Sequence, residues 1–169
     1  MNKTHEMITT DTVRWYLEEA SSLGVKDFYF TGGEPFLHPQ LADIIRETLN
    51  AGQSTVLSNG TLITDAVAQR FGQISRNSKY KLEFRISLES PIEAENDQIR
   101  GSGSFHRAIK GIQALLLAGF NPIITTADWT KYGKLAKEID AGFRSLIGSL
   151  RAPQLRLKKL PLVLLGRCA

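Results

Sequence analysis

The chain has 169 residues, enough for one domain with a buried core, and 42% of them are hydrophobic and 22% charged. This is ordinary globular usage and argues against a disordered or fibrous chain. The formal net charge is +4, but all 17 acidic residues lie at or before Asp140 and six basic residues follow it. We therefore expect a mildly acidic body and a basic, solvated tail.

The N-terminus and the single cysteine limit the compartment and the partners. Residues 1–11 lack the apolar core of a signal peptide, and the longest apolar run, residues 160–165, is too short to cross a bilayer. Cys168 stands alone, which excludes an internal disulfide framework or a multi-cysteine metal site. The basic tail has no interleaved aromatic residue, which argues against nucleic acid as a partner. We expect a cytoplasmic protein with no membrane segment.

A helix–glycine–strand unit recurs along residues 10–126. Apolar side chains at helical spacing predict a first helix at residues 10–23, with Thr10 as its N-cap and Gly24 in the left-handed conformation beyond its end. A short apolar strand at residues 26–30 follows. It ends in the turn Thr31-Gly32-Gly33-Glu34-Pro35.

The second and third units repeat this order. The second helix ends at Gly52, and a strand at residues 54–57 ends in Ser58-Asn59-Gly60. A third helix begins near Thr64 and precedes a strand at residues 82–88. The inward faces of these two helices are predicted at Leu41, Ile44, Ile45, Thr48 and Leu49, and at Val67, Ala68, Phe71 and Ile74.

A fourth helix, a fourth strand and a further helix complete the pattern. The inward apolar face of the fourth helix is predicted at Phe105, Ile109, Ile112 and Leu116. A strand at residues 121–126 and a helix near residues 131–150 follow. One more strand is possible around residues 155–158.

Strands that alternate with helices of about a dozen residues predict βαβ crossovers and a parallel sheet. The strands are nearly continuous apolar runs, so we expect a sheet buried on both faces. A complete eight-stranded barrel needs about 250 residues, more than this chain has. We predict an α/β fold, a partial (β/α) barrel of four or five parallel strands. Residues 1–150 form an incomplete (β/α) domain in this interpretation, and residues 151–169 a basic C-terminal segment.

Polar and glycine residues follow the predicted strands where each strand ends, and in a parallel sheet these ends share the edge where ligands bind. Turn formation explains the glycines and Asn59, but Glu34 has no special role in turns. Pro35 favours an extended Glu34, and the preceding glycines allow close approach of a ligand to the backbone. The carboxylate suits a ligand ammonium group. The alternative is an exposed Glu at a helix start.

The segment TGGEPFLHP at residues 31–39 resembles the G-G-E-P segment of radical S-adenosylmethionine (SAM) enzymes. Residues 57–61, LSNGT, resemble the third strand of that family, and residues 84–90, FRISLES, resemble the fourth. Residues 96–101, NDQIRG, and Ser104-Phe105 resemble the loop-to-helix segment that follows. The resemblance covers residues 10–126. It implies a partial barrel of the radical SAM type whose first strand is missing.

The resemblance also implies a binding site for SAM. Gly32, Gly33 and Glu34 would contact the methionine amine, Ser87 and Arg100 the ribose or carboxylate, and Asn59 would line the pocket. The planar guanidinium of Arg100 suits a carboxylate because it can bind both oxygens.

The residues themselves leave alternatives open. Arg100 could instead form a surface ion pair with Asp97 or Glu95, and Asn59 could simply form a turn. Glu89 stands where the family usually has Asp. His5, His38 and His106 lack metal-ligand spacing and are interpreted as surface or helix-start residues.

In the family, a C-x-x-x-C-x-x-C loop after the first strand holds a 4Fe–4S cluster that cleaves SAM reductively, and the product abstracts hydrogen from a substrate. This sequence has no such loop, and Cys168 cannot replace it. We therefore interpret the chain as a truncated core of a radical SAM enzyme, with an unknown substrate and an exposed sheet edge. We assign it neither catalytic residues nor metal ligands. We expect the isolated chain to bind no cluster and to cleave no SAM.

Two alternatives remain. The chain could be a non-catalytic SAM- or partner-binding module that pairs in trans with a chain carrying the cluster loop, marked by an adjacent reading frame with the cysteine motif. It could also be an unrelated small α/β enzyme for a phosphorylated ligand, although no G-x-x-x-x-G-K-[ST] loop is present. Calorimetric titrations with SAM and with nucleotides distinguish these two alternatives.

Overall fold

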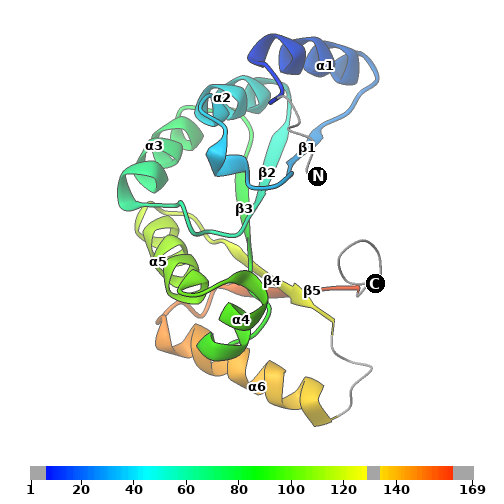
Figure 1. Ribbon diagram of the computed structural model, residues 1–169. Helices are drawn as coiled ribbons and strands as arrows, with labels where there is room; N and C mark the ends of the chain where they lie inside the picture. The colour runs from blue at the N-terminus through cyan, green and yellow to red at the C-terminus, as the bar shows by residue number, and fades with distance from the viewer. Residues whose placement is uncertain (1–6, 129–133, 162–169) are drawn as a thin grey trace.

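Five strands form one parallel sheet in the computed structural model, which describes residues 7–128 and 134–161 (Figure 1). The strands lie side by side in chain order, β1-β2-β3-β4-β5. Their bounds are Asp27–Phe30, Gln53–Ser58, Leu82–Ser87, Ile123–Ala127 and Arg156–Leu160. Within the described residues β1 pairs only with β2, and β5 only with β4, so the sheet is open rather than closed into a barrel.

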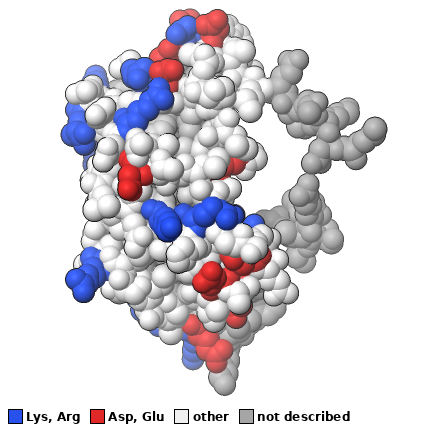
Figure 2. Space-filling model, turned by 60° about the vertical axis from the view of Figure 1, so that its left-hand side comes forward, with Lys and Arg blue, Asp and Glu red and all other residues white. Residues whose placement is uncertain are grey.

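The helices lie on the outer face of this curved sheet, and the described residues place no helix on the inner face (Figure 1). They are α1 (Thr10–Ser22), the short 3₁₀ helix η1 (Pro35–Leu37), α2 (Leu41–Ala51), α3 (Asp65–Arg76), α4 (Glu93–Arg100), α5 (Ser104–Leu117) and α6 (Lys134–Ser149). Basic and acidic side chains are interspersed on the helix-bearing side shown in Figure 2, as on an ordinary solvated surface. None of the described helices is both long and apolar enough to cross a membrane.

The hydrophobic core lies between the outer face of the sheet and the helices. Phe84 on β3 is fully buried, and its ring packs against Phe120, Phe71 and Phe36 with centroid separations of 4.9, 5.7 and 6.2 Å. The inward face predicted for the second helix is confirmed, because every member of it is buried in α2. This layer of aromatic and aliphatic side chains fixes the helices on the sheet.

The inner face of the sheet corrects one expectation. Burial alternates strictly along β3, where Leu82, Phe84 and Ile86 are buried against the helices and the residues between them are only partly covered. Those residues are Glu83, Arg85 and Ser87. The expected burial of both faces holds for β4 but is wrong for β3, whose inner-face residues are polar and partly open to solvent. The sequence of β3 is not a continuous apolar run. Its apolar and polar residues alternate, and this alternation indicates burial of one face only.

Two helix assignments also differ from the prediction. The N-cap of α1 is Thr9 rather than Thr10, because the Thr9 hydroxyl accepts a hydrogen bond from the Thr12 amide at 3.1 Å. The segment predicted as a loop before the fourth helix contains α4, a polar helix whose buried residue is Asn96. Its sequence lacks the apolar stripe that periodicity detects. Gly24, with φ of 79°, is left-handed as predicted.

The fourth predicted helix corresponds to α5, but its buried face is displaced around the helix. Ala108, Ile112 and Leu115 are fully buried, whereas Phe105, Ile109 and Leu116 are only partly covered. The small residues Ala108 and Gly111 let the helix approach the sheet closely, which a count of large apolar residues does not reveal.

The possible last strand is present as β5, so the sheet extends beyond residue 150. The basic tail is not simply solvated. Arg156 pairs with Glu83 at 2.8 Å, and Lys159 pairs with Asp140 at 2.6 Å. Cys168, His5 and residues 131–133 of the last predicted helix lie outside the described residues.

Candidate binding site at the carboxyl ends of the strands

A cavity of about 500 Å³ lies where the strands end and the helices begin. Four of the six predicted binding residues line it: Gly33 after β1, Asn59 after β2, Ser87 at the end of β3, and Arg100 at the end of α4. The remaining lining residues are Thr61, Asn96, Ser104, Arg107 and Ala108. The polar ends of three strands thus meet in one place, as the parallel sheet predicts.

Glu34 joins the turn after β1 to the end of β2. Its backbone is extended, with φ of −150°, as the following proline predicts. One carboxylate oxygen accepts hydrogen bonds from the Ser58 hydroxyl at 2.7 Å and the Phe36 amide at 3.1 Å. The other accepts one from the Asn59 amide at 2.8 Å. Glu34 therefore caps η1 and holds two strand ends together, a role that sequence reasoning missed.

Gly32 and Glu34 are not among the residues that line the cavity, so their contact with a ligand amine stays a prediction. A carboxylate offers about four lone-pair positions, and three of those of Glu34 are occupied by described residues. The second oxygen, which accepts only from the Asn59 amide among the described residues, retains one further position for a donor.

Asn59 has the turn-forming role that the sequence offered, and its part in a SAM pocket stays a prediction. Its side-chain oxygen accepts from the Thr61 amide at 2.9 Å and the Thr61 hydroxyl at 2.7 Å, which is the turn-forming role. The same residue also lines the cavity. Its side-chain amide nitrogen makes no hydrogen bond to any described residue, and so provides two donors for a ligand.

Arg100 is held by Glu89, and neither of its expected partners, Asp97 and Glu95, contacts it. Its Nε and Nη2 atoms donate to one oxygen of Glu89 at 3.1 and 2.5 Å. These two nitrogens share one edge of the guanidinium plane. The other edge, Nη1 with the second Nη2 hydrogen, has no partner among the described residues and could bind a carboxylate through two hydrogen bonds. Glu89 thus orients Arg100.

Asp97 organises the segment that carries Arg100. Its carboxylate accepts hydrogen bonds from the Phe105 amide at 2.8 Å, the Ser104 hydroxyl at 2.9 Å and the Gly103 amide. These groups lie at the start of α5, and they stabilise the ionised carboxylate. The hydrogen bond from the Phe105 amide is the largest cause that lowers the pKa of Asp97, although desolvation opposes it. Asp97 thereby acts as an N-terminal cap supplied from another helix.

Asn96, the neighbour of Asp97, is fully buried and fixes the same junction. Its side-chain oxygen accepts from the Glu89 amide at 3.0 Å, and its nitrogen donates to the Ser104 hydroxyl at 3.1 Å. Sequence reasoning missed Asn96 and Asp97 because their partners lie six to eight residues away, beyond the spacing of local capping motifs.

Two glycines set the distance between the cavity floor and α5. A Cβ atom on Gly111 would lie 2.3 Å from the carbonyl oxygen of Gly60, so a larger residue at this position requires the backbone to move. Gly60 itself has φ of 75°, and a Cβ there would lie 2.8 Å from Ile86. The turn after β2 therefore packs directly on the backbone of α5.

The two histidines in the described part of the chain, His38 and His106, do not line this cavity. His38 accepts a hydrogen bond from the Gln40 amide through Nδ1 at 3.1 Å, and its Nε2 lies 2.7 Å from the Ile8 carbonyl oxygen. It therefore lies at a helix start, as predicted, and ties the N-terminal segment to the start of α2. His106 is exposed on α5.

The residues present fit SAM but not an iron–sulfur cluster. The cavity offers an arginine edge for a carboxylate, and hydroxyl and amide groups for a ribose. The carboxylate of Glu34, next to the lining residue Gly33, has one acceptor position for an ammonium. In contrast, the described residues contain no group of three His, Cys, Asp or Glu side chains that could hold a metal ion. The whole sequence has one cysteine, whereas a cluster of this kind needs several thiolates.

Comparisons with known proteins show the family of this chain. The model of the "Radical SAM superfamily" matches residues 1–130. The AdoMet-dependent heme synthase of Methanosarcina barkeri is 32% identical over 145 residues, which are 79% of this chain and 40% of that protein. The GTP 3',8-cyclase of Microcystis aeruginosa is 31% identical over 106 residues, which are 60% of this chain and 31% of that protein.

Solved structures share the fold. The structure described as native anSMEcpe with bound AdoMet matches 95% of this chain and 44% of its own, with a TM-score of 0.72 and 12% identity. The chain thus spans less than half the length of each of these relatives. The match of the family model over most of the chain decides the assignment: this chain belongs to the radical SAM superfamily.

Proposed function

We propose that this chain forms the SAM-binding part of a radical SAM enzyme and that the methionine and ribose of SAM bind in the cavity at the strand ends. The unused edge of Arg100, held in place by Glu89, carries the proposal. It binds the SAM carboxylate, while Ser87 and the side-chain amide of Asn59 reach the ribose. The free position on Glu34, with the backbone of Gly32 and Gly33, receives the amine.

The reaction of the whole enzyme is part of the proposal. In this family, a 4Fe–4S cluster supplies the electron that cleaves SAM. Since this sequence lacks the cysteines for it, the ligands have to come from residues outside the chain. The described residues bind and orient SAM. The cytoplasmic location expected from the sequence belongs to the same proposal.

Calorimetry on the full 169-residue chain tests SAM binding. We expect SAM to bind and ATP not to bind. Arg100→Gln should weaken SAM binding about 10- to 100-fold, because a charge-assisted pair of hydrogen bonds is lost. The same substitution should hardly change the binding of decarboxylated SAM, which has no carboxylate for Arg100 to bind. Arg70→Gln, on the exposed surface of α3, is the matched control. Binding of ATP in preference to SAM would favour an unrelated phosphate-ligand enzyme.

A second candidate is a module that binds SAM and acts in trans with a chain that carries the cluster loop. The edge of β1 that faces away from β2 pairs with no strand in the described part of the chain, and an apolar cavity of about 380 Å³ lies beside β1, which favours this candidate. Among its lining residues Tyr16 and Leu23 are exposed by 54% and 77%. An unpaired strand edge next to an apolar surface is a typical site for strand addition.

Co-expression tests this second candidate. The partner is a polypeptide from an adjacent reading frame that contains C-x-x-x-C-x-x-C. It should co-purify with this chain, and Tyr16→Glu should abolish the association, while Leu117→Glu on the remote surface of α5 should not. Absence of co-purification with the unchanged chain would exclude association with that partner.

A further inference from the structure

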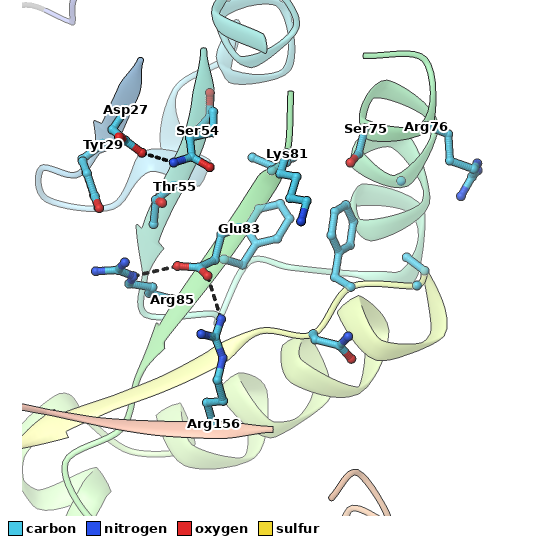
Figure 3. A pocket seen from close by; sticks show the side chains of 18 residues that line it. Asp27, Tyr29, Ser54, Thr55, Ser75, Arg76, Lys81, Glu83, Arg85 and Arg156 are labelled. Carbon is cyan, nitrogen blue, oxygen red and sulfur yellow. Dashed lines mark hydrogen bonds and ion pairs between the residues drawn. The ribbon is translucent and has the colours of Figure 1, made fainter. Parts of the chain in front are cut away.

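A second, larger cavity of about 770 Å³ lies at the starts of the strands, where inner-face residues and residues from the end of α3 and the turn before β4 line it together (Figure 3). Tyr29, Thr55, Glu83, Arg85 and Arg156 contribute to its wall from four strands. Figure 3 shows the side chains of Arg85 and Arg156 both reaching the carboxylate of Glu83. The proposed SAM site uses none of these five residues.

The sheet register arranges the inner-face residues in two rows. Arg85, Ile123 and Arg156 lie opposite one another on β3, β4 and β5 and form the lower row. Ser87, Thr125 and Lys158 form the upper row, one step nearer the strand ends. Ser87 also lines the cavity at the strand ends, so the inner face leads directly to the proposed SAM site.

Glu83 holds the two arginines and leaves most of their donors available. One of its oxygens accepts from Arg85 Nε at 3.0 Å, and the other accepts from Arg156 Nη2 at 2.8 Å. The ring of Tyr29 lies 5.2 Å from the Arg85 guanidinium and limits its movement. Both terminal nitrogens of Arg85 make no hydrogen bond to any residue that the structure describes. This edge can therefore bind two oxygens of an anion.

The charges of these rows do not cancel. Arg85, Arg156 and Lys158 are three cations, and Glu83 is the acidic residue that pairs with two of them. Lys158 forms no ion pair within the described part of the chain, in contrast to its neighbour Lys159, which pairs with Asp140 on the outer face. Asp27 lies at the far end of the cavity and bonds to Gln53. An excess of positive charge on a partly enclosed face favours a negatively charged ligand.

We propose that the inner face of the sheet binds a substrate with carboxylate or phosphate groups, held by Arg85, Arg156 and Lys158 above Ile123. Glu83 positions the two arginines. The anionic groups fix the substrate so that its remainder points toward Ser87 and the bound SAM. This inference rests on the proposed function, since it names the substrate class for that site.

Two probes test the inference on the full chain: inorganic pyrophosphate and tricarballylate, titrated by calorimetry at constant ionic strength. We expect at least one of them to bind. Preference for pyrophosphate would indicate a phosphorylated substrate, and preference for tricarballylate a polycarboxylate. Absence of binding by both would overturn the inference.

Two neighbouring lysines provide the matched variants, because Lys158 and Lys159 lie on opposite faces of β5. Lys158→Gln and Arg156→Gln should each weaken anion binding about 10-fold, the effect of losing one charged contact, and Lys159→Gln should leave it unchanged. An equal effect of Lys159→Gln would show a general charge effect and refute the site. Thermal unfolding of each variant checks that the fold is retained.

A SAM titration of the same variants separates the two proposals. Arg156→Gln and Lys158→Gln should bind SAM like the unchanged chain. If SAM binds and neither anion does, the inference fails and the proposed function stands. If the unchanged chain does not bind SAM, the proposed function fails and the substrate assignment fails with it.

Discussion

The two faces of strand β3 have different tasks although their residues alternate along one segment. On the outer face, Leu82, Phe84 and Ile86 are buried under helices and stabilise the fold. On the inner face, Glu83 and Arg85 form a hydrogen-bonded charged cluster beside a cavity, and Ser87 reaches the proposed SAM site. Stability and ligand binding are thus separated by the pleat of the strand, so that substitutions on one face can leave the other task unaffected.

The strongest test of this separation is Phe84→Ala. Phe84 is fully buried among three other aromatic rings, so its truncation should lower the free energy of unfolding by about 3–5 kcal/mol. Urea denaturation measures the change. A loss below about 1 kcal/mol would show that the outer face does not carry the stability assigned to it.

Glu34→Gln probes the link between the first two strand ends and should have the next largest effect. The substitution keeps the size of the side chain but replaces one acceptor oxygen by a donor facing the amide of Asn59 or the hydroxyl of Ser58. The expected loss of stability is about 1–3 kcal/mol, since charge-assisted hydrogen bonds are lost. Ser58→Ala, which removes one of the three donors, should cost less. Equal costs would contradict the role of Glu34 as the common acceptor.

Arg85→Met is the counterpart of Phe84→Ala on the inner face. Methionine retains the packing on Tyr29 but removes the charge, so stability should change by about 1 kcal/mol or less. Pyrophosphate or tricarballylate binding should nevertheless fall about 10-fold, because the unused guanidinium edge is gone. A large loss of stability with unchanged anion binding would reverse the assignment of the two faces.

Asp97→Asn should produce the smallest effect, a loss of stability at neutral pH that shrinks as the pH falls. Because the folded protein lowers the pKa of Asp97, the carboxylate contributes stability above its unfolded pKa, and this contribution disappears as the pH falls through the folded value. The free energy of unfolding should thus decline less steeply from pH 4 downward in Asp97→Asn than in the unchanged chain. Asp65→Asn, in the first turn of α3, is the control. Identical acid profiles for Asp97→Asn and the unchanged chain would refute the capping role.

The parallel sheet and four of the cavity residues could be predicted because their signals are local. Apolar periodicity located the helices that carry large side chains, and glycine and proline marked the turns after the strands. Helix α4 was missed since its stability comes from Asn96 and Asp97, whose partners lie on another element. The pairing of Arg100 with Glu89 was missed for the same reason: the sequence offered Asp97 and Glu95 as partners, and the fold brings Glu89 to Arg100 instead.

The close approach of Gly60 and Gly111 has a consequence for how the site can vary. With no side chain between the two backbones, the separation of the turn from α5 is set by main-chain contact alone. Substitutions of Asn59, Thr61 or Arg107 can then alter the polarity of the cavity while its width stays constant. Evolution can therefore change which chemical groups the cavity recognises without changing the size of the cavity.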